Sequence, residues 1–322
     1  MSNEPDPIRD EGCLADRSTV RFPLYEPEGA VRRRLRVGVG LVLGFLMPRR
    51  RAHLERGEHA GDRLDLPDRL IIAGLAWRHK RSGTLGKLTG LHNWLWRSDG
   101  AMILHMGMGS DHRYQTEWVE KGSVIVAPLG EAIEEFAQRD ESIETLCEIG
   151  TGTGRILADV AVRLPMLRTL IGLDLSAGQV EINRRRYGEN PRLRFECADA
   201  MQWLPAHARP RWAYFSWGGV LEYFSEEMLE TLFTDIARRK APALFAIVEP
   251  LAKDYDLARE TKSRPYDREL SLGHNYPYWL ERGGWSVRFH AEVLSNDVRF
   301  LLLVAEVDRK SVTTRPSART KS

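Results

Sequence analysis

Short apolar runs alternate with helical stretches over the second half of the chain. The runs are Leu146–Cys147, Leu170–Leu173, Leu193–Cys197, Trp212–Ser216 and Ala243–Val248. Two of them are continuous, as in strands buried on both faces, whereas Leu193–Cys197 alternates like a half-buried strand. Between them, Ala177–Tyr187 and a stretch from about Glu226 to Arg239 have the spacing of helices. This alternation predicts an α/β fold built on a parallel sheet.

The last two apolar segments follow a different pattern. Trp285–Leu294 alternates as a strand, residues 295–297 form a turn cluster, and Arg299–Val307 reads as a second strand. Two strands joined by so short a connection must be antiparallel. The sheet is therefore expected to end on a reversed strand, whereas a nicotinamide-binding Rossmann domain ends on parallel ones.

The first apolar run leads into a turn with three alternate glycines, Gly150, Gly152 and Gly154, two positions after Glu148. Glycine has no Cβ, so the backbone can turn tightly and a ligand can approach it closely. The helix that follows directs free N–H groups at the turn. The dinucleotide fingerprint G-x-G-x-x-G would need its third glycine at position 155, which is Arg155. The turn therefore predicts a cofactor cradle with a spacing unlike that of nicotinamide enzymes.

Two acids stand at the ends of the next two predicted strands. Asp174 lies 24 residues after Gly150 and precedes a helix capped by Ser176. An acid about 20 residues beyond a glycine-rich turn can accept hydrogen bonds from ribose hydroxyls, which predicts a ligand with an adenosine moiety. Asp199 ends the third strand and could equally cap the following turn.

The motif Glu148–Gly154, the acids Asp174 and Asp199 and the closing hairpin together resemble the class I S-adenosylmethionine (SAM)-dependent methyltransferases. The resemblance covers residues 128–307. It implies a Rossmann-like α/β fold with a mostly parallel seven-stranded sheet and an antiparallel last strand, and it implies SAM as the cofactor. The cofactor-binding positions that it implies are Glu148, Gly150, Thr151, Gly152, Gly154, Asp174, Leu175, Asp199, Ala200 and Ser216. In the family, an acid at the position of Asp199 accepts a hydrogen bond from the adenine amino group.

Residues 217–224 resemble the segment that lines the methyl-transfer site in small-molecule methyltransferases. They lack the Asn/Asp-Pro-Pro-aromatic signature of enzymes that methylate nucleic-acid bases. A general base should lie at the carboxyl ends of the strands, where open α/β sheets bind ligands. Glu222 and Glu249 qualify, and His274 in the insert after the fifth strand is our first candidate because its ordinary pKa lies near neutrality. A structural hydrogen bond is the alternative for His274.

The N-terminal region divides less clearly. Residues 1–30 are polar and proline-rich, and we expect them to be poorly ordered. We expect residues 31–127 to form a mainly helical cap or substrate region and residues 308–322 to form a flexible basic tail. Within residues 31–51, arginines flank an uncharged stretch of 11 residues, too short for the ~20 that span a bilayer. Two interpretations stay open: this segment lies on an anionic membrane surface, or it packs on the domain with a solvated basic rim.

Two further patterns fall in this region. Residues 67–79 read as a helix, and residues 92–118 collect His92, Trp94, Trp96, His105, Met106, Met108, His112, Tyr114 and Trp118. The spacing of the three histidines matches no usual metal site, so we expect no metal and interpret the cluster as the wall of a substrate pocket. In related methyltransferases a tyrosine before the first strand lies near the methionyl end of SAM, and Tyr114 is the candidate here. A second helix is expected from about Glu131 to Arg139.

Charge and cysteine content indicate which partners and which compartment to expect. The formal charge of +2 gives no global case for a nucleic-acid partner. Cys13, Cys147 and Cys197 have no metal or disulfide spacing, and the last two are expected as small core residues in a reducing, cytoplasmic compartment. The leading hypothesis is a SAM-dependent methyltransferase acting on a small molecule such as a secondary metabolite, a sugar or a lipid-like O or N nucleophile. The alternatives are an NAD(P)-dependent oxidoreductase and a non-catalytic subunit with a methyltransferase fold.

Overall fold

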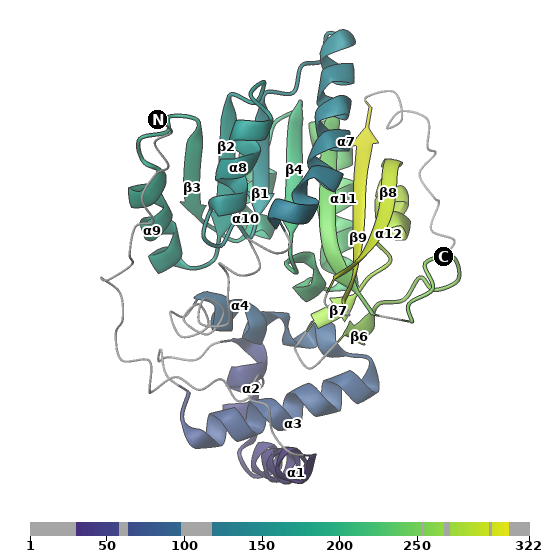
Figure 1. The fold of residues 1–322 in the computed structure, drawn as a ribbon. Helices are drawn as coiled ribbons and strands as arrows, with labels where there is room; N and C mark the ends of the chain where they lie inside the picture. The colour runs from purple at the N-terminus through teal and green to yellow at the C-terminus, as the bar shows by residue number, and fades with distance from the viewer. Residues whose placement is uncertain are drawn as a thin grey trace.

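The structure is a computed structural model of the 322-residue chain. It describes residues 30–57, 64–97, 118–252, 254–266, 271–295 and 298–308. The segments expected to be poorly ordered at the N-terminus and flexible at the C-terminus lie almost wholly outside these ranges. The described chain forms a central sheet with helices on both faces and a separate group of helices below one edge of the sheet (Figure 1).

The sheet has seven strands in the order β3-β2-β1-β4-β5-β9-β8. They are β1 (Thr145–Ile149), β2 (Thr169–Asp174), β3 (Leu193–Cys197), β4 (Trp212–Trp217), β5 (Ala243–Leu251), β8 (Ser286–Ser295) and β9 (Val298–Val307). Strands β1 to β5 pair in parallel, and β9 pairs antiparallel with both β5 and β8. This is the class I methyltransferase fold, and the predicted fold class is confirmed.

Two layers of helices bury the two faces of the sheet. On one face lie α7 (Val119–Gln138), α8 (Arg155–Arg163) and α9 (Ala177–Tyr187), and on the other α10 (Ala200–His207), α11 (Glu226–Lys240) and α12 (Tyr276–Gly283). Each layer has its own apolar cluster. The near-continuous burial of β5 on both faces accounts for its unbroken apolar sequence.

Helix α7 is longer than the sequence indicated, because it begins at Val119 and not near Glu131. Its buried side chains Ile125, Leu129, Ile133 and Phe136 recur at helical spacing and pack on the sheet, which stabilises a helix through Pro128. The expected boundary between residues 127 and 128 falls inside this helix, and the division of the chain into domains stays a prediction.

The N-terminal helices form a small cluster of their own, as expected for a mainly helical region. They are α1 (Ala30–Leu46), α2 (Pro48–Arg56), α3 (Leu66–Ser82), the 3₁₀ helix η1 (Leu85–Leu88) and α4 (Thr89–Arg97). Their core contains Leu54, Ile71, Leu75 and Leu91. Leu272 joins it from the hairpin of β6 (Arg264–Tyr266) and β7 (Ser271–Gly273), which belongs to the insert after β5. This insert therefore ties the helical cluster to the sheet.

One expectation about the cysteines is wrong. Cys147 is buried in β1, but Cys197 is exposed, because it is the last residue of β3, which lies at the edge of the sheet. Cys13 lies outside the described residues. Among the described helices, none is long and apolar enough to cross a membrane.

Candidate functional site

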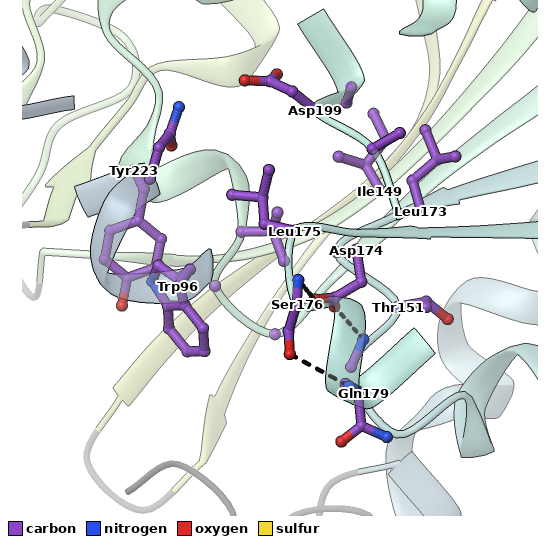
Figure 2. Close-up of a pocket in the computed structure, with 18 of the residues that line it drawn as sticks. Trp96, Ile149, Thr151, Leu173, Asp174, Leu175, Ser176, Gln179, Asp199 and Tyr223 are labelled. Atoms are coloured by element: carbon purple, nitrogen blue, oxygen red, sulfur yellow. Dashed lines mark hydrogen bonds between the residues drawn. The ribbon is translucent and has the colours of Figure 1, made fainter. Parts of the chain in front are cut away.

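A cavity of about 240 Å³ opens at the carboxyl ends of β1, β2 and β4 (Figure 2). The turn between β1 and α8 forms its floor, the ends of β2 and β3 contribute Asp174 and Asp199, and α4 contributes His92 and Trp96 from the opposite side. At this point β1 is followed by a helix on one face of the sheet and the neighbouring β4 by a helix on the other face. Open α/β sheets bind ligands at such a point. The cavity is thus walled partly by the sheet and partly by the N-terminal helices.

The glycine turn has the geometry that its sequence suggested. Gly152 and Gly154 both have positive φ, at +51° and +72°. A Cβ on Gly152 would meet no atom within 4 Å, whereas one on Gly154 would lie 2.8 Å from the ring of Phe195. Gly154 therefore allows close packing behind the turn, and Gly152 leaves the backbone open to a ligand.

Asp174 connects the two loops at the base of the cavity. Its Oδ2 accepts a hydrogen bond from the backbone N–H of Gly152 at 2.9 Å, and its Oδ1 accepts one from Ser176 at 2.9 Å. Burial raises the pKa of this carboxyl, and the backbone donors partly oppose that effect. A carboxylate has about four lone-pair sites, so Asp174 can still accept hydrogen bonds from a ligand.

Glu148 lies behind the turn and does not line the cavity. It is buried at the end of β1 and accepts a hydrogen bond from the hydroxyl of Thr151, which does line the cavity. Burial raises the pKa of Glu148 to about 8, and the nearby Asp174 adds to the shift. The first acid of the motif thus supports the turn from within the core.

Asp199 has the capping role considered for it in the sequence and also lies at the cavity wall. Its Oδ1 accepts a hydrogen bond from the backbone N–H of Met201 at 3.0 Å and caps α10. Its Oδ2 lies 3.4 Å from Arg97 at the end of α4. Both Asp199 and Ala200 line the cavity, so the capping contact leaves the carboxylate at the cavity wall.

Aromatic side chains form the side of the cavity opposite Asp174. The rings of His92 and Tyr223 stack with centroids 3.7 Å apart, and Trp96 lies 6.2 Å from Tyr223 in a tilted arrangement. Figure 2 shows Trp96 and Tyr223 together on one side, across from Leu175 and Ser176. Because α4 supplies two of these rings and the loop after β4 the third, this wall exists only where the helical cluster meets the sheet.

His92 is a neutral hydrogen-bond donor at this wall. Burial lowers its pKa to about 3. Its Nε2 accepts a hydrogen bond from the indole N–H of Trp96, which places the ring hydrogen on Nδ1. The buried Nδ1 has no partner among the described residues, although buried donors in proteins almost always have one.

The loop after β4 is held by Glu249 from the neighbouring strand. This carboxylate accepts hydrogen bonds from the backbone N–H groups of Val220 and Leu221 at 3.1 and 3.0 Å and from the hydroxyl of Ser216. These contacts fix the start of the 3₁₀ helix η3 (Leu221–Tyr223), which carries Tyr223. Burial raises the pKa of Glu249 to about 7, and these three donors oppose that shift together with the backbone N–H of Glu222.

The two residues expected in catalysis, His274 and Glu222, do not line the cavity. His274 is fully buried in the insert after β5, where its Nδ1 lies 2.6 Å from the hydroxyl of Ser263. Burial lowers its pKa to about 3, so the argument from a near-neutral pKa does not hold in the fold. Glu222 lies buried against Gly219. A part for either in catalysis stays a prediction, and the geometry favours support of the loop.

The cavity therefore collects part of the residues expected from the sequence. Its walls include Gly150, Thr151, Gly152, Asp174, Leu175, Asp199 and Ala200. Gly154 and Ser216 pack behind it with Glu148, and Tyr114 lies outside the described residues. In the aromatic cluster, His92 and Trp96 line the cavity, but Trp94 packs with the helical cluster and Trp118 with the sheet. The expectation of a pocket wall is wrong for these two tryptophans, because their helices turn them into the apolar clusters.

Other lining residues were missed by the sequence reasoning. Gln179 and Met228 lie in the first turns of α9 and α11, and Ile156 lies at the start of α8. The available signal was their position, because the first turn of a helix that follows a parallel strand lies at the ligand-binding edge of the sheet. Within the described ranges, no group of three or more His, Cys, Asp or Glu side chains is arranged to hold a metal ion.

Comparisons with known proteins agree with this architecture. Residues 146–243 match the model of a family described as a methyltransferase domain. This stretch runs from β1 to the start of β5 and contains the glycine turn, Asp174 and Asp199. Over this stretch the chain thus carries a methyltransferase domain. No curated protein matches the chain.

Solved structures with a similar fold share little sequence with the chain. A SAM-dependent methyltransferase from Clostridium acetobutylicum ATCC 824 is 11% identical with a TM-score of 0.44, over 63% of this chain and 99% of that one. Geranyl diphosphate C-methyltransferase from Streptomyces coelicolor A3(2), solved with Mg²⁺, geranyl diphosphate and S-adenosyl-L-homocysteine, is 13% identical with a TM-score of 0.41, over 56% and 77%. The [4+2]-cyclase SpnF is 17% identical with a TM-score of 0.41, over 51% and 74%.

Proposed function

We propose that this protein binds SAM in the cavity at the carboxyl edge of the sheet and transfers its methyl group to a small-molecule acceptor. The observation that carries the proposal is the convergence, in one cavity, of an open glycine turn, two carboxylates at neighbouring strand ends and an aromatic wall from the N-terminal helices. The methyltransferase domain match spans the first two of these features.

The residues of the cavity fit this cofactor. Asp174 retains lone pairs for ribose hydroxyls, and Asp199 stands one strand further, where the adenine amino group would be recognised. The open space beside Gly152 allows the methionyl part to run along the backbone of the turn. Bound SAM supplies a methyl group activated by the sulfonium. The remaining task of the protein is to hold an acceptor in line with the S–CH₃ bond.

The aromatic wall supports a small and partly apolar acceptor. Trp96 and Tyr223 lie across the cavity from Leu175 and Ser176 (Figure 2), and His92 stacks on Tyr223. Binding sites for small molecules are mostly apolar with a few placed polar groups. His92 contributes its ring to this wall through its stack on Tyr223, while its Nδ1 is buried and not exposed to the cavity. Its low pKa means that His92 is neutral near pH 7 and that its ring does not act there as a general base.

Alignment is the main contribution that the described residues can make to methyl transfer. Holding two reactants in a reactive geometry can lower a barrier by about 7–11 kcal/mol in favourable cases. The stacked rings and the η3 turn fixed by Glu249 provide a rigid surface for this purpose. The small-molecule acceptor, recognised by shape and by one or two polar contacts, also agrees with a formal charge of only +2, which gives no general attraction to nucleic acid.

Calorimetry with SAM, S-adenosylhomocysteine and NAD tests the cofactor assignment. We expect SAM and S-adenosylhomocysteine to bind and NAD not to bind. Replacing Asp174 by alanine or asparagine should weaken SAM binding by about tenfold or more, since hydrogen bonds to a charged group contribute roughly 1.5–3 kcal/mol. The asparagine keeps one of the two acceptor oxygens that hold the loop N–H groups, so it disturbs the loop less than alanine does. Glu181→Gln, on the exposed face of α9, is the matched control.

Each result bears on the proposal. Binding of NAD without SAM would indicate an oxidoreductase and contradict it. SAM affinity unchanged in both Asp174 variants would remove the ribose role of that residue. Binding of SAM without methyl transfer in a screen of small molecules with labelled donor would favour the non-catalytic alternative, whereas labelled product from such a screen would support the proposal and identify the acceptor.

A further inference from the structure

Helix α1 packs on the rest of the molecule through one face only. That face lies against α3, and the two backbones approach so closely that a Cβ on Gly40 would come within 1.9 Å of the carbonyl oxygen of Leu70. A Cβ on Gly74 of α3 would likewise lie within 2.7 Å of the backbone of Gly40. Such contact through small residues fixes how the helix is rotated about its axis, and it therefore fixes which side chains face away.

The opposite face of α1 is apolar and exposed. Its large side chains at the surface are Val31, Leu35, Val39, Val42, Phe45 and Leu46, with exposed fractions from 46% to 79%. At 100° per residue these six positions fall within an arc of roughly 120°. A helix of a globular protein normally turns such a stripe toward the core. Here Gly40 and Gly44 lie on the core-facing side with Leu43, and the stripe faces outward.

Positive charge surrounds the stripe. Arg32 and Arg34 are exposed and fall on its two sides, and Arg49 is exposed just beyond its end. Within the described residues, no ion pair involves these three arginines. Residues 30–54 contain seven arginines and no aspartate or glutamate. An apolar stripe with a cationic border on both sides is complementary to a surface with an apolar interior and anionic head groups.

We infer that α1 docks in the plane of an anionic lipid membrane, with its exposed apolar stripe among the acyl chains and its arginines on lipid phosphates. The helix has 17 residues and lies parallel to the surface in this arrangement, since it is too short and too charged at its start to cross the bilayer. This inference concerns the surface of the helical cluster and does not depend on the proposed methyl transfer.

A second copy of the chain is a poorer occupant of this face. Two α1 helices packed in parallel would bring their arginine-rich first turns against each other without any acid in residues 30–54 to compensate. A membrane surface with anionic lipid instead attracts the exposed Arg32, Arg34 and Arg49, whereas Arg50 is already held in ion pairs with Asp65 and Asp68. Helix α1 also lies at the end of the molecule remote from the sheet (Figure 1), so a flat surface can reach it without contacting the methyltransferase domain.

Vesicle cosedimentation of the full-length protein tests the inference without SAM present. We expect wild type to sediment with vesicles of equal parts phosphatidylglycerol and phosphatidylcholine, and far less with phosphatidylcholine alone. The double variant Val42→Asp/Phe45→Asp should lower the partition coefficient on the mixed vesicles by at least about tenfold. The variant Arg32→Ala/Arg34→Ala should lower it by about tenfold or more and reduce the preference for anionic lipid.

Val162→Asp is the matched control, because this side chain is 78% exposed on α8, away from α1, and should leave vesicle binding unchanged. Since Val42 and Phe45 are already exposed, thermal melting by circular dichroism should show that the double variant remains folded. The inference is overturned if wild type stays in the supernatant, or if the folded double variant sediments like wild type. Light scattering that shows a wild-type dimer and a monomeric double variant would also overturn it, because a second copy would then cover the stripe.

Discussion

Four buried ionisable side chains link protonation to stability at the residue scale. In the fold the pKa of Glu148 is raised to about 8 and that of Glu249 to about 7, while the pKa values of His92 and His274 are lowered to about 3. Above the ordinary glutamate pKa of 4.5 the folded state holds protons that the unfolded chain has released, so stability falls as pH rises through 7 and 8. Below the ordinary histidine pKa of 6.5 the two histidines are protonated in the unfolded chain but stay neutral in the folded state, so the free energy of unfolding falls as pH decreases.

Between pH 4.5 and 6.5 the two effects offset one another, and we expect stability to be greatest in that window. Replacing Glu148 by glutamine should remove its share of the alkaline loss and keep an acceptor for Thr151. The free energy of unfolding of the variant minus that of wild type should increase by about 1–2 kcal/mol from pH 6.5 to pH 8. The reason is that a difference of one bound proton between the folded and unfolded states is equivalent to about 1.4 kcal/mol per pH unit.

Urea unfolding at several pH values measures this difference. The control is Glu144→Gln, because Glu144 lies exposed just before β1 and should leave the pH dependence unchanged. A parallel pH profile for Glu148→Gln and wild type would mean that Glu148 is ionised in the fold, contrary to its burial.

At the scale of elements, the short helix η3 depends on a single carboxylate from another strand. It has only three residues, too few to form alone, and Glu249 binds the N–H groups at its start. Through η3, Glu249 holds Tyr223 in the aromatic wall although it lies outside the cavity itself. The same carboxylate also accepts the hydroxyl of Ser216, so β4 and β5 are tied together at their carboxyl ends.

Glu249→Gln should therefore destabilise the protein by about 1–3 kcal/mol, because the amide NH₂ of glutamine would face backbone N–H donors that then lose their acceptor. The same variant should lower the affinity for S-adenosylhomocysteine as the loop at residues 217–224 becomes less ordered. Thermal unfolding and calorimetry measure the two effects, and Glu227→Gln on the exposed side of α11 is the control. Unchanged stability at neutral pH would show that the loop does not need this carboxylate.

At the scale of the whole molecule, the cavity belongs to two parts of the chain that pack together. The turn after β1 and the strand ends form one wall, and His92 and Trp96 on α4 form the other. Arg97 approaches Asp199 across this junction at 3.4 Å, and Leu272 of β7 joins the core of the helical cluster. A ligand in the cavity should therefore couple the two parts.

Hydrogen exchange with and without S-adenosylhomocysteine tests that coupling. At a ligand concentration one hundred times the dissociation constant, the bound state is stabilised by about 2.7 kcal/mol. We expect slower exchange at short labelling times in α4 as well as in residues 150–154 and 217–224, with α1 unchanged as the internal control. Protection confined to the glycine turn would contradict a shared cavity.

The methyltransferase domain could be predicted from the sequence because its signals are local. Parallel strands buried on both faces give continuous apolar runs, a turn with positive φ requires glycine, and a short connection forces the last two strands to be antiparallel. The parallel sheet, its reversed last strand and the place of Asp174 followed from these features, whereas the seven-stranded sheet and the place of Asp199 in the cofactor site came from the resemblance to class I methyltransferases, and the strand order came from the structure. The length of α7 was not predicted, because Pro128 obscured a helix that tertiary packing stabilises.

The tertiary structure decided which polar residues the cavity includes. His274 was chosen from its ordinary pKa, but packing of the insert against η3 buries it and leaves it neutral, whereas His92 reaches the cavity because α4 packs beside the loop after β4. The sequence likewise left residues 31–51 open between two interpretations. Only the close approach of Gly40 to α3 fixed the rotation of α1 and exposed its apolar stripe, because the facing of a helix depends on its partner as well as on its own pattern.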